Sequence, residues 1–202
     1  MSITELTIQG VLLHSDFTGE NFSRISIFSK NGLQRFLLRK SQRKNAMSLP
    51  GFLDEVEITL NPSNKEGIPF IKEYIIIQKR IELGAHREAF EAAGKLACFY
   101  LINGEHLLEP KSFHEILIKA LTSLSNGGNP SVILFKALFL FARKEGVPVK
   151  ESWLADQDIV IRKIIISILK SPVKDSEKFS PQVSRILDSL LMWFKKETEF
   201  IC

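Results

Sequence analysis

The spacing of the apolar residues changes once along this chain, near residue 80, and this change restricts the possible folds more than any other feature. Before it, apolar and polar residues alternate in short runs, which is typical of strands with one buried face. After about Glu82, apolar residues recur with the period of a helix that packs on one side. The two parts meet at Lys79-Arg80 without a Gly- or Ser-rich linker. We therefore predict an α+β protein with two domains, residues 1–80 and residues 81–202.

Five short strands are predicted in residues 1–80. Asn31-Gly32 is a strong hairpin signal between the second and the third strand, and the polar residues 16–21 predict a turn. A long basic connection, residues 40–50, separates the third strand from the fourth. This pattern predicts a small, highly curved barrel, and the expected architecture is the five-stranded OB-fold, which binds oligonucleotides. The predicted strands are Ile8 to about His14, Phe22–Ser29, Leu33–Arg39, Val56–Leu60 and Phe70–Ile77.

The second domain is predicted to be all-α. Its third helix, from Asn129-Pro130 to Gly146, is apolar nearly all round, so we expect it to be the central one. Residues 158–170 are rich in Ile and compatible with a buried strand, but their apolar positions fit a helix better. The other helices are expected at about Leu83–Ile102, from a capping box at Ser112 and Glu115 to Leu124, and from Ser180-Pro181 onward.

Positive charge is concentrated in one segment of the chain. The 27 Lys and Arg residues exceed the 23 Asp and Glu residues only slightly, giving a formal charge of +4. Between Glu20 and Asp54, however, there are seven basic residues and no acidic one. Such segments commonly contact phosphate backbones, although a solvated surface that keeps the protein soluble is the alternative. The seven are Arg24, Lys30, Arg35, Arg39, Lys40, Arg43 and Lys44.

Six of these residues are candidates for one continuous phosphate track. Arg35 and Arg39 share a face of the third predicted strand, and Arg24 lies on the neighbouring strand. Aromatic side chains beside a positive groove can stack on bases, whereas a small barrel also needs such side chains to fill its core. The Phe residues open to both interpretations are Phe22, Phe28, Phe36 and Phe52. The candidate DNA-binding residues are Arg24, Arg35, Arg39, Lys40, Arg43 and Lys44.

No sequence motif supports an enzyme. The chain has no Walker loop, Gly-x-Gly-x-x-Gly, Gly-x-Ser-x-Gly or His-Glu-x-x-His motif. His14-Ser15-Asp16 contains the residue types of a triad, but neighbours on an extended chain point to opposite sides, so we interpret it as a strand end and turn. Two cysteines are too few for a four-cysteine zinc site, and Cys98 is expected to be a small buried apolar residue. We therefore predict no catalytic residues, no metal and no cofactor.

The sequence also gives no sign of membrane insertion. No apolar stretch approaches the roughly 20 residues of a membrane span, and the N-terminal residues lack the pattern of a signal peptide. We expect a soluble, cytoplasmic protein.

Several segments resemble the RecO family of bacterial recombination mediators, in that family's order. Residues 11–21, 25–28 and Gly32 are similar to its opening strand, Gly-Glu-Asn turn, Ile-x-x-Phe strand and glycine turn. Residues 48–52 resemble its approach to the fourth strand, and residues 124–146 resemble its helix, Asn-Pro break and Phe-rich helix. The resemblance covers about residues 1–150. The chain departs from it at 38–40, where a small-residue turn is missing, and after Gly146, where many members carry a four-cysteine zinc module.

The resemblance implies a DNA repair and recombination protein of the bacterial cytoplasm, associated with the nucleoid. Such proteins bind single- and double-stranded DNA, anneal complementary strands and, with RecR, help to load RecA onto strands coated by single-strand-binding protein. They hold the acidic, apolar C-terminal tail of single-strand-binding protein in a groove of the helical domain. In this chain the third helix would supply Phe135, Lys136, Phe139 and Arg143, with ordinary core packing as the alternative for both Phe residues.

The two departures keep a second interpretation open. Because the turn and the zinc module differ, a RecO-like protein-interaction scaffold with little or no DNA binding is the alternative to a DNA-binding mediator.

Overall fold

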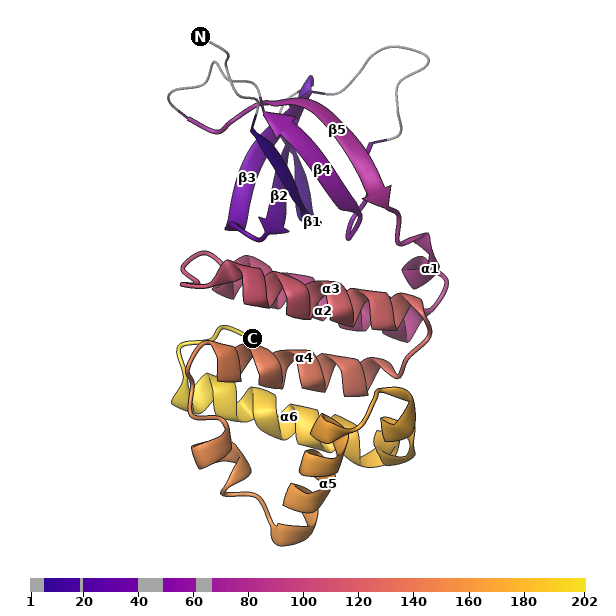
Figure 1. Ribbon diagram of the computed structural model, residues 1–202, viewed down its shortest axis with the longest axis vertical. Helices are drawn as coiled ribbons and strands as arrows, with labels where there is room; N and C mark the ends of the chain where they lie inside the picture. The colour runs from indigo at the N-terminus through magenta and orange to yellow at the C-terminus, as the bar shows by residue number, and fades with distance from the viewer. Residues whose placement is uncertain (1–5, 19, 40–48, 61–66) are drawn as a thin grey trace. The chain divides into compact units, whose positions relative to one another are not determined.

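The protein is α+β, with a five-stranded antiparallel sheet followed by helices, as the change in apolar spacing predicts (Figure 1). The computed structural model describes residues 6–18, 20–39, 49–60 and 67–202. The chain divides into two compact units, one formed by residues 1–80 with 104–114 and the other by residues 81–103 with 115–202. Residues 104–114, which we expected in the helical domain, thus group with the strands.

The strands follow one another in the sheet in the order β3-β2-β1-β4-β5, and all neighbouring pairs are antiparallel. The two edge strands also approach each other at one point. There Leu37 of β3 forms a parallel bridge with Phe70, the residue just before β5. There the Leu37 N–H donates a hydrogen bond of 2.9 Å to the Pro69 carbonyl. The strands are β1 (Thr7–Thr18), β2 (Phe22–Ser29), β3 (Gly32–Arg39), β4 (Glu55–Leu60) and β5 (Ile71–Gln78).

One strand is longer than its sequence predicts. We expected β1 to end near His14 and a turn to begin at Asp16, but β1 continues to Thr18. Asp16 pairs with Arg24 and Thr18 with Phe22, so the pairing with β2 outweighs the turn preference of these polar residues. The predicted hairpin between β2 and β3 is confirmed, and Gly32 has the positive φ of 94° that glycine adopts readily.

Alternate side chains of the sheet form one buried apolar cluster, as the period-two pattern predicts. Across β2 and β3, Ile25 is opposite Phe36, and both are almost fully buried. The remaining members of the cluster are Ile8, Leu12, Ile27, Leu38, Val56, Ile58, Leu60 and Ile71.

Six α-helices follow the sheet within the described residues. The first predicted helix is interrupted: α1 ends at Gly84 and α2 begins at Arg87. Gly84 is a poor helix former, and the N–H groups of Ala85 and His86 donate to carbonyls three residues earlier instead of four. The helices are α1 (Ile81–Gly84), α2 (Arg87–Asn103), α3 (Pro110–Ser125), α4 (Pro130–Lys144), α5 (Ile159–Lys170) and α6 (Ser180–Glu197), with a π-helical turn at Lys150–Leu154 and a 3-10 helix at Lys174–Phe179.

The α4 helix is central to its unit, as its apolar surface predicts. It packs against α2, α5 and α6, and most of its side chains are buried. It begins at Pro130, and the side chain of Asn129 accepts a hydrogen bond of 3.0 Å from the Val132 N–H. The segment 159–170 is a helix, with Asp158 as its N-cap, so the helical interpretation of this Ile-rich stretch is confirmed. Among the described residues, no helix combines the length and the apolar character needed to cross a bilayer.

Candidate functional site

Three of the candidate arginines lie on one outward face of the sheet. Residues opposite each other on neighbouring strands share a face, and Arg24 is opposite Leu37 while Arg35 is opposite Ser26. The residues between them, Ile25 and Phe36, belong to the buried cluster, so the arginines point away from it. Arg24, Arg35 and Arg39 are all exposed. The other three candidates, Lys40, Arg43 and Lys44, lie outside the residues that the structure describes.

This face also carries acidic residues that come from outside the basic segment. The carboxylate of Glu105, seventy residues after Arg35, forms an ion pair with the Arg35 guanidinium. Asp16 of β1 is directly opposite Arg24 of β2. The basic segment contains no acidic residue of its own. In the folded protein, however, two of its arginines have carboxylates from other segments as neighbours.

His14 and Asp16 are in contact on the same face of β1. His14 Nε2 lies 2.8 Å from Asp16 Oδ1. Ser15 lies between them in the sequence and pairs with Ile25, so its side chain is on the opposite face. The three residue types of a triad are thus not assembled here, although two of them touch.

The candidate aromatic platforms separate into core and surface residues. Phe28 and Phe36 are buried, so the core-packing alternative holds for both. Phe22 is half-buried, and its ring contacts the Phe70 ring edge to face, with centroids 5.6 Å apart. Phe52 is 41% exposed, and Phe17, which we placed in a turn, is 80% exposed on β1.

The second unit contains a groove with an apolar floor and a basic rim. It has a volume of about 430 Å³ and is formed by α4, the π-helical turn and α5. From α4, Lys136, Phe139, Leu140 and Arg143 line it, which are positions on one stripe of a helix. No acidic side chain is among its lining residues within the described chain. The other lining residues are Lys150, Leu154, Ile166, Leu169 and Lys170.

The structure therefore brings three of the four candidate groove residues together. Phe135 does not line the groove: it is fully buried and packs with Phe139 and Trp153 beneath it. Phe139 is 1% exposed, so it too is mainly a core residue. The core-packing alternative thus describes Phe135 fully and Phe139 largely.

One basic group of the groove is held by the protein itself. The Lys136 ammonium donates a hydrogen bond to the Ser171 carbonyl at the end of α5. Partial burial lowers the pKa of Lys136 below its ordinary value, because the charged form loses contact with water. Lys150 of the π-helical turn and Lys170 of α5 also line the groove but were not predicted, because no local pattern marks them and only tertiary packing places them on the rim.

The cysteines and acidic residues do not form a metal centre in the described part of the chain. No group of three or more His, Cys, Asp or Glu side chains there is arranged to hold a metal ion. Cys98, which we expected to be buried, is exposed on α2. The reason is its position on the helix: the neighbouring Ala97 and Phe99 face the core and Cys98 does not.

No protein-family model matches the sequence, and no curated protein is significantly similar to it.

Proposed function

We propose that this protein is a RecO-like recombination mediator that binds DNA strands and anneals them. The observation that carries the proposal is the set of three arginines, Arg24, Arg35 and Arg39, on one outward face of two neighbouring strands. Annealing requires no bond chemistry; two strands approach each other when positive side chains neutralise their phosphates. A sheet face is a suitable surface for this, since it holds the three charges in fixed positions.

The strand order supports an OB-like architecture for this unit. In a closed five-stranded barrel of this kind the two edge strands must meet, and the parallel bridge between Leu37 and Phe70 is a contact of that type. The resemblance of residues 1–150 to RecO proteins supports the same proposal. We include the partners that it implies: single- and double-stranded DNA, single-strand-binding protein, RecR and, through them, RecA. The protein would act in the bacterial cytoplasm at the nucleoid.

The groove along α4 is the proposed site for the C-terminal tail of single-strand-binding protein. An acidic, apolar peptide needs an apolar floor for its side chains and cations for its carboxylates. The groove combines five apolar residues with Lys136, Arg143, Lys150 and Lys170.

A salt titration of oligonucleotide binding tests the DNA-binding proposal. Six phosphate contacts to a single strand predict a slope of about −4 in a plot of log affinity against log salt. Arg35→Glu/Arg39→Glu should weaken binding and make the slope shallower, since two contacts become repulsive. The matched control is Lys119→Glu/Lys163→Glu, which makes the same charge change at two exposed helix positions. Equal affinities of the two double variants would refute the proposal.

The second candidate function is a protein-interaction scaffold without DNA binding. The observation that favours it is the presence of Asp16 and Glu105 next to the arginines, together with a groove that has no acidic lining residue. It predicts normal binding of an acidic tail peptide and no measurable affinity for oligonucleotides. Measuring both ligands on the same preparation separates the two functions.

A further inference from the structure

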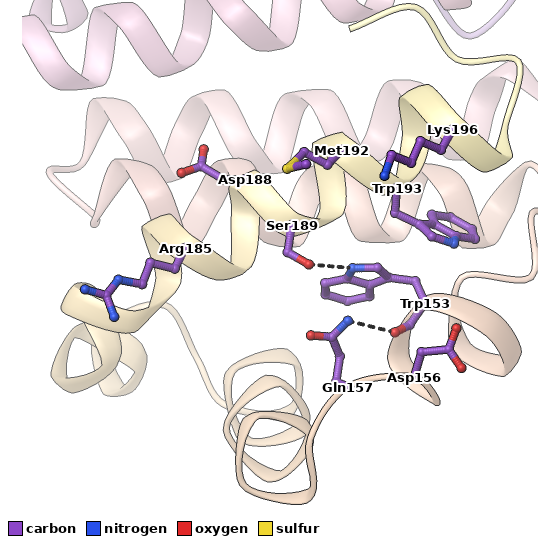
Figure 2. A pocket seen from close by; sticks show the side chains of 9 residues that line it. All are labelled: Trp153, Asp156, Gln157, Arg185, Asp188, Ser189, Met192, Trp193 and Lys196. Atoms are coloured by element: carbon purple, nitrogen blue, oxygen red, sulfur yellow. Dashed lines mark hydrogen bonds between the residues drawn. The ribbon is translucent and has the colours of Figure 1, made fainter.

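A second hollow of the helical unit lies beside α6 and has a different character from the groove along α4. It measures about 500 Å³ and lies between α6 and residues 153–157, at the end of the π-helical turn and just after it (Figure 2). Its floor is fixed by two hydrogen bonds: Trp153 Nε1 donates to Ser189 Oγ at 3.2 Å, and Gln157 Nε2 donates to the Trp153 carbonyl at 3.0 Å. Trp193 adds a half-buried indole to this floor.

The rim of the hollow carries two acidic and two basic side chains, which are all exposed. Arg185, Asp188 and Lys196 come from α6, and Asp156 comes from the segment across the hollow. Figure 2 shows these four groups pointing away from one another, and none of them forms an ion pair with a described residue. The surface therefore has no net charge but holds four charges without an opposite partner, an arrangement that disfavours nucleic acid as the ligand.

An exposed methionine lies in the middle of this charge pattern. Met192 is 59% exposed, an unusual position for an apolar side chain on a helix whose other face is buried. Asp188 precedes it by four residues and Lys196 follows it by four, which is about 6 Å along the helix axis in each direction. All three are on the side of α6 opposite its buried residues Val183, Leu190 and Phe194.

We propose that this face of α6 is a homodimer interface, in which a second copy of the chain packs its own α6 antiparallel to the first. A two-fold axis at Met192 places Asp188 of each copy beside Lys196 of the other, because both are four residues from the axis. The axis generates each contact twice, as in any symmetric dimer. Two of the four charges of each copy, Asp188 and Lys196, then have an opposite charge on the other copy.

The apolar groups fit the same arrangement. The two Met192 side chains meet at the axis and leave water beside the tryptophan-lined hollows, and thioether sulfur packs favourably against aromatic rings. With the axis at Met192, residues 187–197 of the two α6 helices overlap over about 16 Å, which provides a short continuous line of contact. The interface uses neither the arginine face of the sheet nor the groove along α4, so it does not depend on the proposed function.

Sedimentation of the full chain without DNA tests the dimer. Over a protein concentration range on the order of 1–100 µM, we expect the wild-type chain to change from monomer to dimer. Asp188→Lys and Lys196→Asp should each raise the dimer dissociation constant at least about tenfold, because two attractive contacts become two repulsive ones. Glu197→Lys is the matched control: it changes an exposed acidic residue of α6 that does not line the hollow, and it should leave the dissociation constant unchanged.

Mixing the two charge variants distinguishes this dimer from any other. In a heterodimer of the Asp188→Lys chain and the Lys196→Asp chain, both contacts are again between opposite charges, so the mixture should dimerise although neither variant does alone. Both side chains are exposed, and circular dichroism should show that the variants remain folded. A wild-type chain that stays monomeric would overturn the proposal. A dimer that is insensitive to either variant, or a mixture that fails to recover dimerisation, would overturn it as well.

Discussion

The two basic surfaces of this protein, the arginine face of the sheet and the groove along α4, differ in the acidic residues around them. Arg35 is paired with Glu105, and Arg24 is opposite Asp16. Within the described chain, the groove has four basic lining residues and no acidic one. The sequence suggests the reverse order, since the arginines belong to one segment with seven basic residues and no acidic one, whereas the four basic groove residues come from separate parts of the chain.

The difference shows that a charge run in the sequence is a poor measure of the electric field at a surface. The fields of two opposite charges a few ångströms apart largely cancel at the distance of a ligand. This cancellation depends on their separation in space and not on their separation in the sequence. We therefore expect most of the positive charge of the groove to be available to an anionic ligand. On the arginine face, only part of the positive charge should be available.

The largest expected effect concerns the core beneath the groove. Phe135→Ala should lower the free energy of unfolding by about 3–5 kcal/mol, because it removes a fully buried ring from beneath the groove. Trp153 and Trp193, the two tryptophans of the chain, both lie in the second unit, so their fluorescence during urea denaturation reports on that unit.

Leu140→Ala is the control for this prediction. Leu140 lines the same groove but is 39% exposed, so its truncation should cost about 1 kcal/mol or less. Equal losses for both variants would show that Phe135 is not the core residue on which this comparison relies.

The next effect concerns the rim. Arg143→Glu/Lys170→Glu should weaken the binding of an acidic, apolar peptide by at least about tenfold, since two attractive charges become repulsive in a site without acidic neighbours. Fluorescence anisotropy of a labelled peptide measures the change. Both residues are exposed, so stability should be retained.

The exposed residues Lys119 and Lys163 supply the control for the rim, as they do for DNA binding. Lys119→Glu/Lys163→Glu changes the net charge equally but lies outside the groove, and it should leave peptide affinity within about twofold. If it weakens the peptide as strongly as the rim variant, the overall charge and not the groove determines binding.

Local patterns in the sequence predicted the elements well and the surfaces only in part. The Asn31-Gly32 hairpin, the Asn129 cap and the helix at 159–170 all depend on neighbouring residues, and the structure confirms them. The extension of β1 to Thr18 was missed, because pairing with β2 decides it and the local turn preference does not.

The candidate sites show the same limit more sharply. The face of Arg35 followed from strand alternation, but its partner Glu105 is seventy residues away and could not be found from any local pattern. Likewise, the stripe of α4 predicted Lys136 and Arg143, whereas Lys150 and Lys170 reach the groove only through the packing of other elements. Charges that meet by tertiary packing leave no mark in the sequence.

A smaller effect should follow from removing the acid next to Arg35. Glu105→Gln frees the guanidinium, so oligonucleotide affinity should rise about two- to threefold and the salt slope should steepen by about 0.7, the value of one additional phosphate contact. Glu109→Gln removes an exposed acid from the same segment without touching an arginine pair and should have a weaker effect. Identical slopes for the two variants would show that the Arg35–Glu105 pair does not limit binding.

The smallest effect is a pH dependence of the groove. Burial places the pKa of Lys136 below the ordinary 10.5, so this lysine loses its charge at a lower pH than a lysine in water. Affinity for an acidic peptide without Lys, Tyr or Cys should therefore fall by about twofold or less as the pH rises through that lowered pKa, which is the contribution of one partly exposed charge.

The same shift has a consequence for stability, with a definite sign. Because the folded state disfavours the charged lysine, its cost is fully present below the lowered pKa and disappears as the pH rises from there to 10.5. Stability should thus increase in the window in which peptide affinity decreases. Lys136→Arg keeps its charge throughout and should abolish the fall in affinity, while Lys170→Arg should leave it in place. A fall that persists in Lys136→Arg would mean that another group titrates, and the assignment of the pH dependence to Lys136 would then be wrong.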